Sequence, residues 1–316
     1  MAVSKNKALF LKGCLLMSLL LSGCGGQALS EREIVRGVFF TRQQDAFSAC
    51  LVLADQNSEK DSGGEKISAA QGSTPAQALE RAEQALYGDV YYGLLDLAAL
   101  PSDTDLSMAR EIGELLYENA QPAPELSVFV LDDSVFSWAK EGSVLYQNMK
   151  SLEKTYKVHC GLQQLFSQEE VCGIPGYIAG GGYDFLLLPQ YGSPVRCHGL
   201  VEAQLAAVLC GQTSILKGTF ASGRAACEAR TQVLAEGEHL QIHLRDTTLT
   251  VLDPSFSEEA LQSVLEQELQ RSFLKLQQQM QCGGEADPFH LRFWQSCQYG
   301  PDFAPQPPTL EVIFES

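Results

Sequence analysis

Basic residues are scarce in this sequence. Its 316 residues include 22 Lys and Arg against 39 Asp and Glu, which gives a formal net charge of −17. Residues 1–23 hold three Lys and no acid, so without them the balance is 19 minus 39, or −20. Nucleic acids and anionic lipid head groups are bound largely through clustered positive charge. The deficit argues against a basic patch for either, and we expect no nucleic-acid partner.

The N-terminus lacks a hydrophobic run long enough to span a membrane. Its apolar core, Leu15–Leu21, is interrupted by Ser18 and has about 7 residues, whereas a membrane-spanning helix needs about 20. Lys5, Lys7 and Lys12 precede the core, and no acidic residue occurs before Glu31. A positive start followed by a short apolar core and small residues is typical of a secretory signal peptide.

The end of this run is more specific. Leu21, Ser22, Gly23 and Cys24 match the lipobox of bacterial lipoproteins, in which the Cys thiol receives diacylglycerol and becomes the mature N-terminus. The match predicts a signal peptide at residues 1–23 and acyl chains such as palmitate on Cys24. Several tens of buried CH₂ groups, at about 0.8 kcal/mol each, would hold the protein durably at a membrane. The alternatives are an ordinary signal peptide cut nearby and a buried apolar helix.

No CxxC pair and no compact cysteine framework is present. The nearest approach to a metal-binding set is His159, Cys160, Cys172, Cys197 and His198, whose spacings do not match a zinc module. We therefore expect no metal site and mostly buried free thiols, although an exported chain could also form disulfides. Apart from Cys14 and Cys24, the cysteines are Cys50, Cys160, Cys172, Cys197, Cys210, Cys227, Cys282 and Cys297.

Local catalytic signatures are also missing. The sequence contains no GxSxG, no HExxH and no SxxK with its partner motifs. Gly180–Gly182 lacks the lysine and serine of a phosphate-binding loop, so a flexible turn is the better interpretation. The pair Asp132 and Asp133 is typical of a solvated loop. We expect no enzymatic activity and no cofactor, while a site dispersed along the sequence remains an alternative.

What is present has the composition of a folded protein, with 45% hydrophobic residues. The 293 residues left after subtracting 23 from 316 suffice for two or three domains. In residues 24–133, strand-like and helix-like stretches alternate, which predicts an α/β or α+β domain. The first expected helix begins at Thr74, where Gln77 is placed to close a capping box, and the second spans Asp105–Asn119. Between the strands, Gln56–Ser73 is expected to be a polar hairpin loop. The expected strands are Arg32–Phe40, Ala46–Asp55, Asp89–Leu100 and Glu125–Asp133.

The middle segment, residues 134–220, has weaker patterns. Phe136–Tyr156 has an apolar side at helical spacing, which predicts a helix. In Ile174–Pro189, Gly and Pro punctuate the chain ahead of a buried strand at Phe185–Leu188. These patterns indicate a second unit without defining its fold.

The C-terminal segment, residues 221–316, has the clearest periodicity. His239–Arg245 alternates as a strand should, and Thr248–Asp253 is expected to follow as its partner strand. Ser255 and Glu258 have capping-box spacing ahead of an amphipathic helix about 25 residues long. The helix carries Leu261, Leu265, Leu269, Phe273, Leu276 and Met280 on one face, and the alternating stretch Thr309–Glu315 is expected to close the sheet. The whole chain is thus predicted to be a multi-domain α+β or α/β protein, with mixed sheets packed against helices.

This layout resembles the C subunits of nutrient germinant receptors, the Ger(x)C-type lipoproteins of endospore-forming bacteria. The resemblance begins with Cys24 and continues with Arg32 and Glu33 in a first strand segment. It ends with the long helix, an Ala-Asp-aromatic patch, a Trp-containing turn and a final alternating strand. Those last features are Leu261–Met280, Ala286, Asp287, Phe289, Trp294 and Leu310–Phe314. The chain departs from the family pattern in its strong acidity and in the insertion Cys282–Gly284, so the resemblance suggests either a divergent or a repurposed member.

The resemblance implies three α/β modules anchored by lipid at the outer face of the cytoplasmic membrane, which in a spore is the inner membrane. It implies two integral membrane partners, the A- and B-type subunits, and recognition through surface patches in response to a nutrient. Phe289 and Trp294 are then either partner contacts or, as we favour, a cap beneath the long helix.

Two other functions remain open. An extracytoplasmic solute-binding or envelope-assembly lipoprotein, unrelated to germination, predicts a ligand cleft lined by aromatic residues. A lipid-anchored hydrolase predicts a tight cluster of perturbed titratable groups in a pocket.

Overall fold

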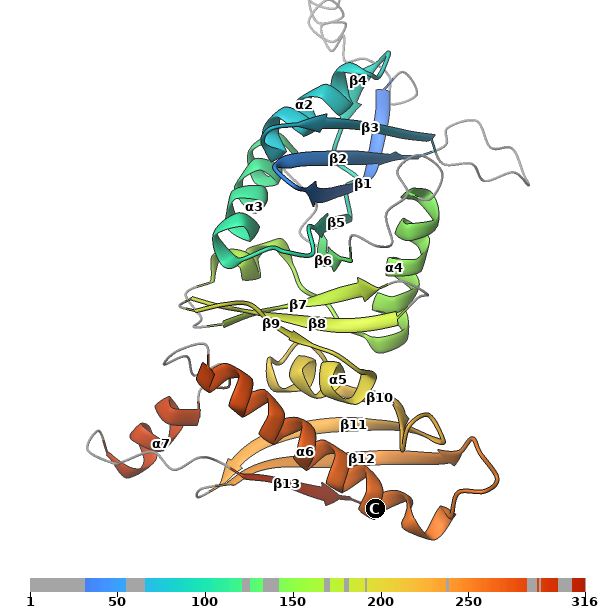
Figure 1. Ribbon diagram of the computed structural model, residues 1–316, viewed down its shortest axis with the longest axis vertical. Helices are drawn as coiled ribbons and strands as arrows, with labels where there is room; N and C mark the ends of the chain where they lie inside the picture. The colour runs from blue at the N-terminus through green and yellow to red at the C-terminus, as the bar shows by residue number, and fades with distance from the viewer. Residues whose placement is uncertain are drawn as a thin grey trace, which may run out of the picture.

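The computed structural model describes residues 32–54, 66–120, 126–132, 142–167, 171–178, 182–190, 192–236, 239–282, 289, 291–300 and 309–315. In these residues two mixed β-sheets each pack against helices, which confirms the predicted fold class (Figure 1). The expected signal peptide, the lipobox and the pair Ala286 and Asp287 lie outside the described residues.

The first sheet has nine strands in the order β3-β2-β1-β5-β6-β7-β8-β9, with β4 also paired to β1. Its centre is parallel, because β1, β4, β5, β6 and β7 run in one direction, while β2, β3, β8 and β9 add antiparallel edges. The strands are β1 (Arg32–Gln43), β2 (Ala46–Leu53), β3 (Lys66–Gly72), β4 (Asp89–Tyr91), β5 (Leu97–Leu100), β6 (Ser127–Leu131), β7 (Val171–Ile178), β8 (Gly182–Pro189) and β9 (Val195–Cys197).

Helices cover both faces of this sheet. Successive side chains of a strand point to opposite faces, so the neighbours Phe39 and Phe40 of β1 enter two different hydrophobic clusters. The cluster with Phe40 is closed by α2 (Pro75–Gln84) and α3 (Leu106–Ala120), and the cluster with Phe39 by α4 (Gly142–Tyr156). Because it is covered on both sides, the sheet contains fully buried strands such as β6.

The second sheet has the order β10-β11-β12-β13 and carries the long helix α6 (Leu261–Cys282) on one face. The apolar face expected of this helix is confirmed, since Leu269, Phe273 and Leu276 are fully buried. The closing strand is also confirmed, and it runs parallel to β12 with Leu240 opposite Leu310. The strands are β10 (Ile215–Phe220), β11 (Ala225–Glu236), β12 (His239–Val251) and β13 (Thr309–Phe314); the remaining elements are α7 (Leu291–Tyr299) and the short helices η3 (Leu162–Phe166) and η4 (Glu258–Ala260).

The helix α5 (Leu200–Leu209) lies between the two sheets (Figure 1). One hydrophobic cluster contains Phe185 of β8, Leu205 of α5 and Ile242 of β12. Apart from Glu202 and Gln204, α5 is apolar, as suits such a buried position, and its Ala203, Ala206 and Ala207 are fully buried. The two sheets therefore share one core.

The strands on either side of the expected boundary at residue 133 belong to one sheet, and β10 ends at the expected boundary at residue 220. β6 pairs with β7 through Val130 and Gly176, so the first sheet continues across residue 133. β10 pairs with β11 in the second sheet, and residue 220 ends the first strand of that hairpin. The described residues form two sheets where the resemblance implied three modules, because β6 and β7 satisfy each other's backbone groups. The ranges 24–133, 134–220 and 221–316 remain predictions.

Several local predictions were wrong. The expected strand Asp89–Leu100 is two strands, β4 and β5, which pair with different parts of β1. β3 occupies the end of the expected polar loop Gln56–Ser73, where its small side chains allow α2 to pack closely and Ser68 Oγ donates to Ala82 O at 2.7 Å. β7 runs through Pro175, which precedes the first residue of β7 paired to β6. The two expected strands His239–Arg245 and Thr248–Asp253 are one strand, β12, which continues through an irregularity at Asp246, where φ is 51°.

Of the two predicted helix N-caps, Thr74 is confirmed and Ser255 is wrong. Thr74 caps α2 as predicted by accepting from Gln77 N at 3.2 Å, although the Gln77 carboxamide accepts from Ser73 N and not from Thr74. Ser255 caps no helix, because its hydroxyl donates to Asp253 at 2.8 Å and α6 begins at Leu261, after η4. Local turn bonding has replaced the expected capping box.

Candidate functional site

The predicted lipidation site, Cys24 within Leu21–Cys24, lies outside the described residues and stays a prediction. Strand β1 begins eight residues later, at Arg32, and pairs there with the start of β4. That end of the molecule lies opposite the four-stranded sheet (Figure 1). No helix within the described ranges is both long and apolar enough to cross a membrane.

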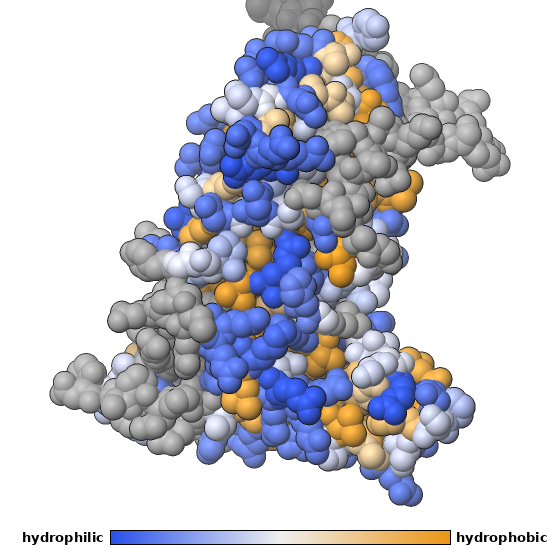
Figure 2. Space-filling view, in the orientation of Figure 1, coloured by the Kyte–Doolittle hydropathy of each residue, from blue (hydrophilic) through white to orange (hydrophobic). Residues whose placement is uncertain are grey.

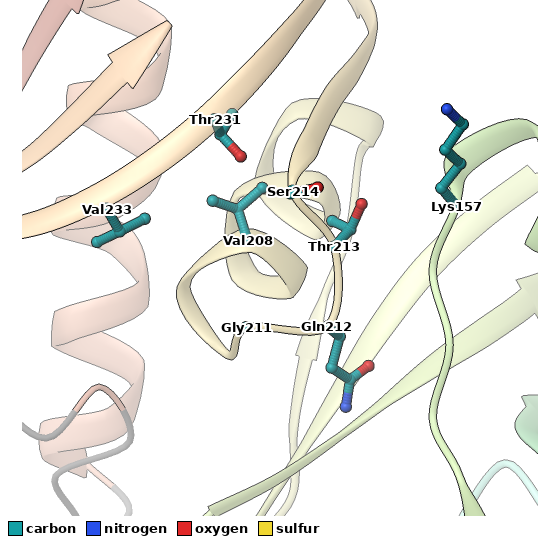
Figure 3. Close-up of a pocket in the computed structure, with 8 residues that line it drawn as sticks. All are labelled: Lys157, Val208, Gly211, Gln212, Thr213, Ser214, Thr231 and Val233. Atoms are coloured by element: carbon teal, nitrogen blue, oxygen red, sulfur yellow. The ribbon is translucent and has the colours of Figure 1, made fainter.

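A groove with a volume of about 460 Å³ lies where the end of α4, the loop from α5 to β10, and β11 meet (Figure 3). Val208 and Thr231 lie on one side of it and Lys157 on the other, while the Gln212 carboxamide points away from Val208 and Thr231 (Figure 3). Its lining contains no aromatic residue. The groove therefore lacks the aromatic lining and the convergent polar groups expected of a solute-binding cleft. The lining residues are Lys157, Val208, Gly211, Gln212, Thr213, Ser214, Thr231 and Val233.

Two polar side chains of the groove hold the structure together. Gln212 Nε2 donates to the carbonyl oxygen of Gly173 in β7. Thr213 Oγ1 donates to Tyr156 O at 3.2 Å and accepts from Ile215 N at 3.2 Å. These bonds fasten the loop that precedes β10 to the first sheet and to α4.

A polar cluster around Glu153 joins α4 to β6. Glu153 Oε2 lies 2.6 Å from Lys150 Nζ, Oε1 lies 3.0 Å from His159 Nδ1, and Oε1 accepts from Ser127 Oγ. Burial alone would raise the pKa of this carboxyl, but the hydrogen bonds from His159, Lys150 and Ser127 lower the pKa of Glu153 to about 2. The group is therefore an anion at every pH near neutrality.

The cluster contains Ser, His and Glu but lacks the geometry of a hydrolase triad. Ser127 Oγ lies 2.9 Å from His159 Nδ1, the same nitrogen that faces Glu153. In a triad the acid and the nucleophile contact opposite nitrogens of the ring, so that a proton can pass between them. Ser127 is also fully buried. The hydrolase alternative predicts titratable groups with shifted pKa values in a pocket. The pKa of Glu153 is shifted, but Ser127, Glu153 and His159 do not line the groove.

A second buried charge, Asp184 of β8, lies 3.4 Å from Arg196 Nη1 of β9. Burial raises the pKa of Asp184, and the positive charge of Arg196 opposes that shift. Arg196 Nη2 also donates to Ser102 O at 2.9 Å, which ties β9 to the chain after β5. Gly176 of β7 faces Asp184, and a Cβ built there would overlap the carboxylate. Sequence reasoning missed this site. The signal that could have found it is Asp184, a lone acidic residue directly before the apolar stretch Phe185–Leu188.

A third network was also missed. Arg36 of β1 bonds to Asp96 Oδ2 and to the Tyr146 hydroxyl, each at 2.9 Å, and the Tyr146 hydroxyl donates to Asp96 Oδ1 at 2.8 Å. Burial and the Asp96 carboxylate raise the pKa of Tyr146. The network fastens α4 to the sheet and uses residues far apart in the sequence.

The cysteines are mostly buried. Burial raises the pKa of Cys50 and of Cys227 to about 12, so both thiols stay protonated and unreactive. Cys160 and Cys172 share a hydrogen bond that, together with burial, raises the pKa of Cys160. No group of three or more His, Cys, Asp or Glu with metal-binding placement occurs among the described residues. The free thiols in that part of the chain include Cys50, Cys160, Cys172, Cys197, Cys227 and the exposed Cys297.

The two aromatic residues near the C-terminus differ in their surroundings. Phe289 packs against the core, with its ring centroid 6.4 Å from that of Phe273 in α6. Trp294 is half-buried on α7 and meets Tyr299 edge to face at 6.4 Å. The position of Phe289 favours the interpretation of this aromatic as a cap on the long helix.

Comparison with known proteins finds a distant likeness. No family model matches the sequence, and no curated protein sequence matches it. A solved structure titled "Crystal Structure of the GerBC protein" aligns with 89% of this chain and 96% of that chain, at 14% sequence identity and a TM-score of 0.42.

Proposed function

We propose that this protein is a lipid-anchored subunit of a nutrient germinant receptor of the Ger(x)C type, and that it acts through contacts with other proteins. The observation that carries the proposal is the order of features along the chain. A lipobox ends at Cys24, a sheet strand with Arg32 and Glu33 follows within eight residues, and the chain closes with a 22-residue helix and a last strand.

The charge of the protein supports anchoring by lipid. With Asp and Glu in large excess, the surface would be repelled by anionic head groups. Figure 2 accordingly shows hydrophilic residues over much of one face, with smaller hydrophobic patches between them. Membrane residence would then depend on the acyl chains of Cys24, at the outer face of the cytoplasmic membrane or the inner membrane of a spore.

The polar clusters support a role without catalysis. The residues that most resemble catalytic groups, Ser127, Glu153 and His159, are occupied with one another in a way that fastens α4 to β6. Asp184 and Arg196 likewise join neighbouring strands. We infer that function resides in the outer surfaces, which would contact A- and B-type integral membrane subunits.

A deletion strain and a pull-down test this proposal together. Spores without the protein should germinate poorly on nutrients, and the tagged protein solubilised from spore membranes should bring down two multi-spanning partners. Recovery of the protein alone, combined with normal nutrient germination of the deletion strain, would sink the receptor proposal.

The Cys24→Ser variant tests the anchor separately. Incorporation of labelled palmitate should disappear in this variant, because the thiol that accepts diacylglycerol is gone. A label that persists would refute the lipobox assignment.

The alternative is an extracytoplasmic solute-binding or envelope-assembly lipoprotein. The groove favours it in one respect, because its volume of about 460 Å³ lies in the range of small-molecule sites. Under this alternative the deletion strain would germinate normally, and a small solute would raise the melting temperature of the purified protein.

A further inference from the structure

Two exposed side chains flank the short strand β4, which pairs with the start of β1. Tyr87, just before β4, is fully exposed, and Leu94, just after β4, is 47% exposed. Tyr91, the last residue of β4, is half-buried. Water-exposed aromatic and aliphatic side chains that cluster in one place commonly mark an interaction surface.

The pairing of β1 with β4 locates this cluster. The strands are parallel, with Arg32 opposite Asp89 and Ile34 opposite Tyr91. The Arg32 guanidinium lies 5.6 Å from the centroid of the Tyr91 ring, within range of a cation–π contact. The hydroxyl of Tyr91 reaches the space beside Gly93, so its ring covers the turn that leads to Leu94. We call Arg32, Tyr87, Tyr91 and Leu94 the tyrosine edge.

The length of the preceding chain limits the distance from this edge to the predicted anchor. Seven residues, 25–31, separate Cys24 from Arg32. Eight Cα-to-Cα steps reach at most about 29 Å when fully extended. The first residue of the tyrosine edge therefore stays within about 29 Å of the acylated residue, whatever the conformation of the tether.

The chemistry of the edge suits a lipid–water interface. Tyrosine is enriched at this boundary because its ring prefers the apolar side and its hydroxyl the wet side. Arginine can extend its apolar stem along lipid while its charged group stays among phosphates. Asp89 is exposed beside Arg32 and would resist entry into hydrocarbon, so the contact is limited to head-group depth.

We propose that the tyrosine edge rests in the head-group region of the membrane that carries the Cys24 lipid. The inference depends on the anchoring that the proposed function assumes. It also assigns an orientation: the end with β4 faces the bilayer, and the four-stranded sheet with α6 lies farthest from it (Figure 1). The far sheet is then free for contacts with soluble portions of partners.

Photo-crosslinking in the native membrane tests the inference. Tyr87 is replaced by the photo-reactive amino acid benzoylphenylalanine in the full-length chain. The matched control carries the same replacement at Tyr299, which is 43% exposed and is the last residue of α7. Helix α7 lies at the end of the molecule with the four-stranded sheet, away from β4 (Figure 1). After irradiation we expect phospholipid adducts at position 87 several-fold above those at position 299.

The outcomes separate the edge from the anchor. Membrane-bound protein whose position 87 crosslinks to another protein, or gives no more lipid adduct than position 299, overturns the membrane contact alone. A wild-type protein that is absent from the membrane fraction overturns the anchoring proposal, and the contact falls with it. Lipid adducts that vanish in the Cys24→Ser background show that the edge needs the anchor, as the inference requires.

Discussion

Buried polar side chains of this protein fasten together segments that are far apart in the sequence. Glu153 of α4 holds Ser127 of β6, and Glu202 of α5 lies 2.5 Å from Lys275 of α6. A buried charge without a partner is costly, so each of these pairs selects one arrangement of helix and sheet. Their removal should therefore be visible as a loss of stability.

The Glu153→Gln variant tests this at one residue. The pKa of Glu153 is about 2 in the folded protein, below the ordinary value of 4.5. A lowered carboxyl pKa contributes stability that is fully present above the ordinary pKa and is lost as the pH falls through the folded value. A carboxyl pKa lowered by this much contributes about 3 kcal/mol to the free energy of unfolding at pH 7. Denaturant unfolding should show a large loss in the variant at pH 7 and a smaller loss near pH 3.

The control is Glu111→Gln, which changes an exposed carboxylate on α3. It should alter the free energy of unfolding by less than about 0.5 kcal/mol at either pH. An equal loss at both pH values for Glu153→Gln would mean that the side chain matters for packing and not for its charge.

Elements with strong local periodicity could be predicted from the sequence. The stripe from Leu261 to Leu276 requires one buried face, and α6 has it. β11 was missed because its exposed positions include Glu228 and Arg230 and its buried ones include small alanines. The sequence pattern predicts two strands in place of β12, because the polar residues around Asp246 are typical of a turn. In the structure Asp246 has a positive φ, and the strand continues through a local irregularity there.

The attachment of α6 to the second sheet can be tested with neighbouring residues. Phe273 is fully buried against the sheet, whereas Leu274 is 53% exposed on the same helix. Phe273→Ala should lower the free energy of unfolding by about 3–5 kcal/mol, because it removes apolar contact and leaves a cavity. Leu274→Ala should change it by less than about 0.5 kcal/mol. Similar losses for the two variants in urea unfolding would contradict the packing of α6.

At the scale of the whole molecule, the arrangement of the sheets could not be predicted. The pairing of β6 with β7 joins strands about forty residues apart, and local periodicity contains no information on such partners. The same holds for the candidate sites. The lipobox is a local motif and can be read directly, whereas Ser127, Glu153 and His159 meet only after folding. The tyrosine edge likewise depends on the register of β1 and β4.

The position of α5 predicts that the two sheets unfold together. Leu205 is fully buried in the cluster that includes Phe185 of the first sheet and Ile242 of the second. Leu205→Ala should destabilise the protein by about 2–5 kcal/mol. Because α5 contacts β8 of the first sheet and β10 of the second, amide hydrogen exchange should accelerate in β8 and in β10 alike. Acceleration confined to one sheet would show that α5 belongs to that sheet alone, and that the shared core does not couple them.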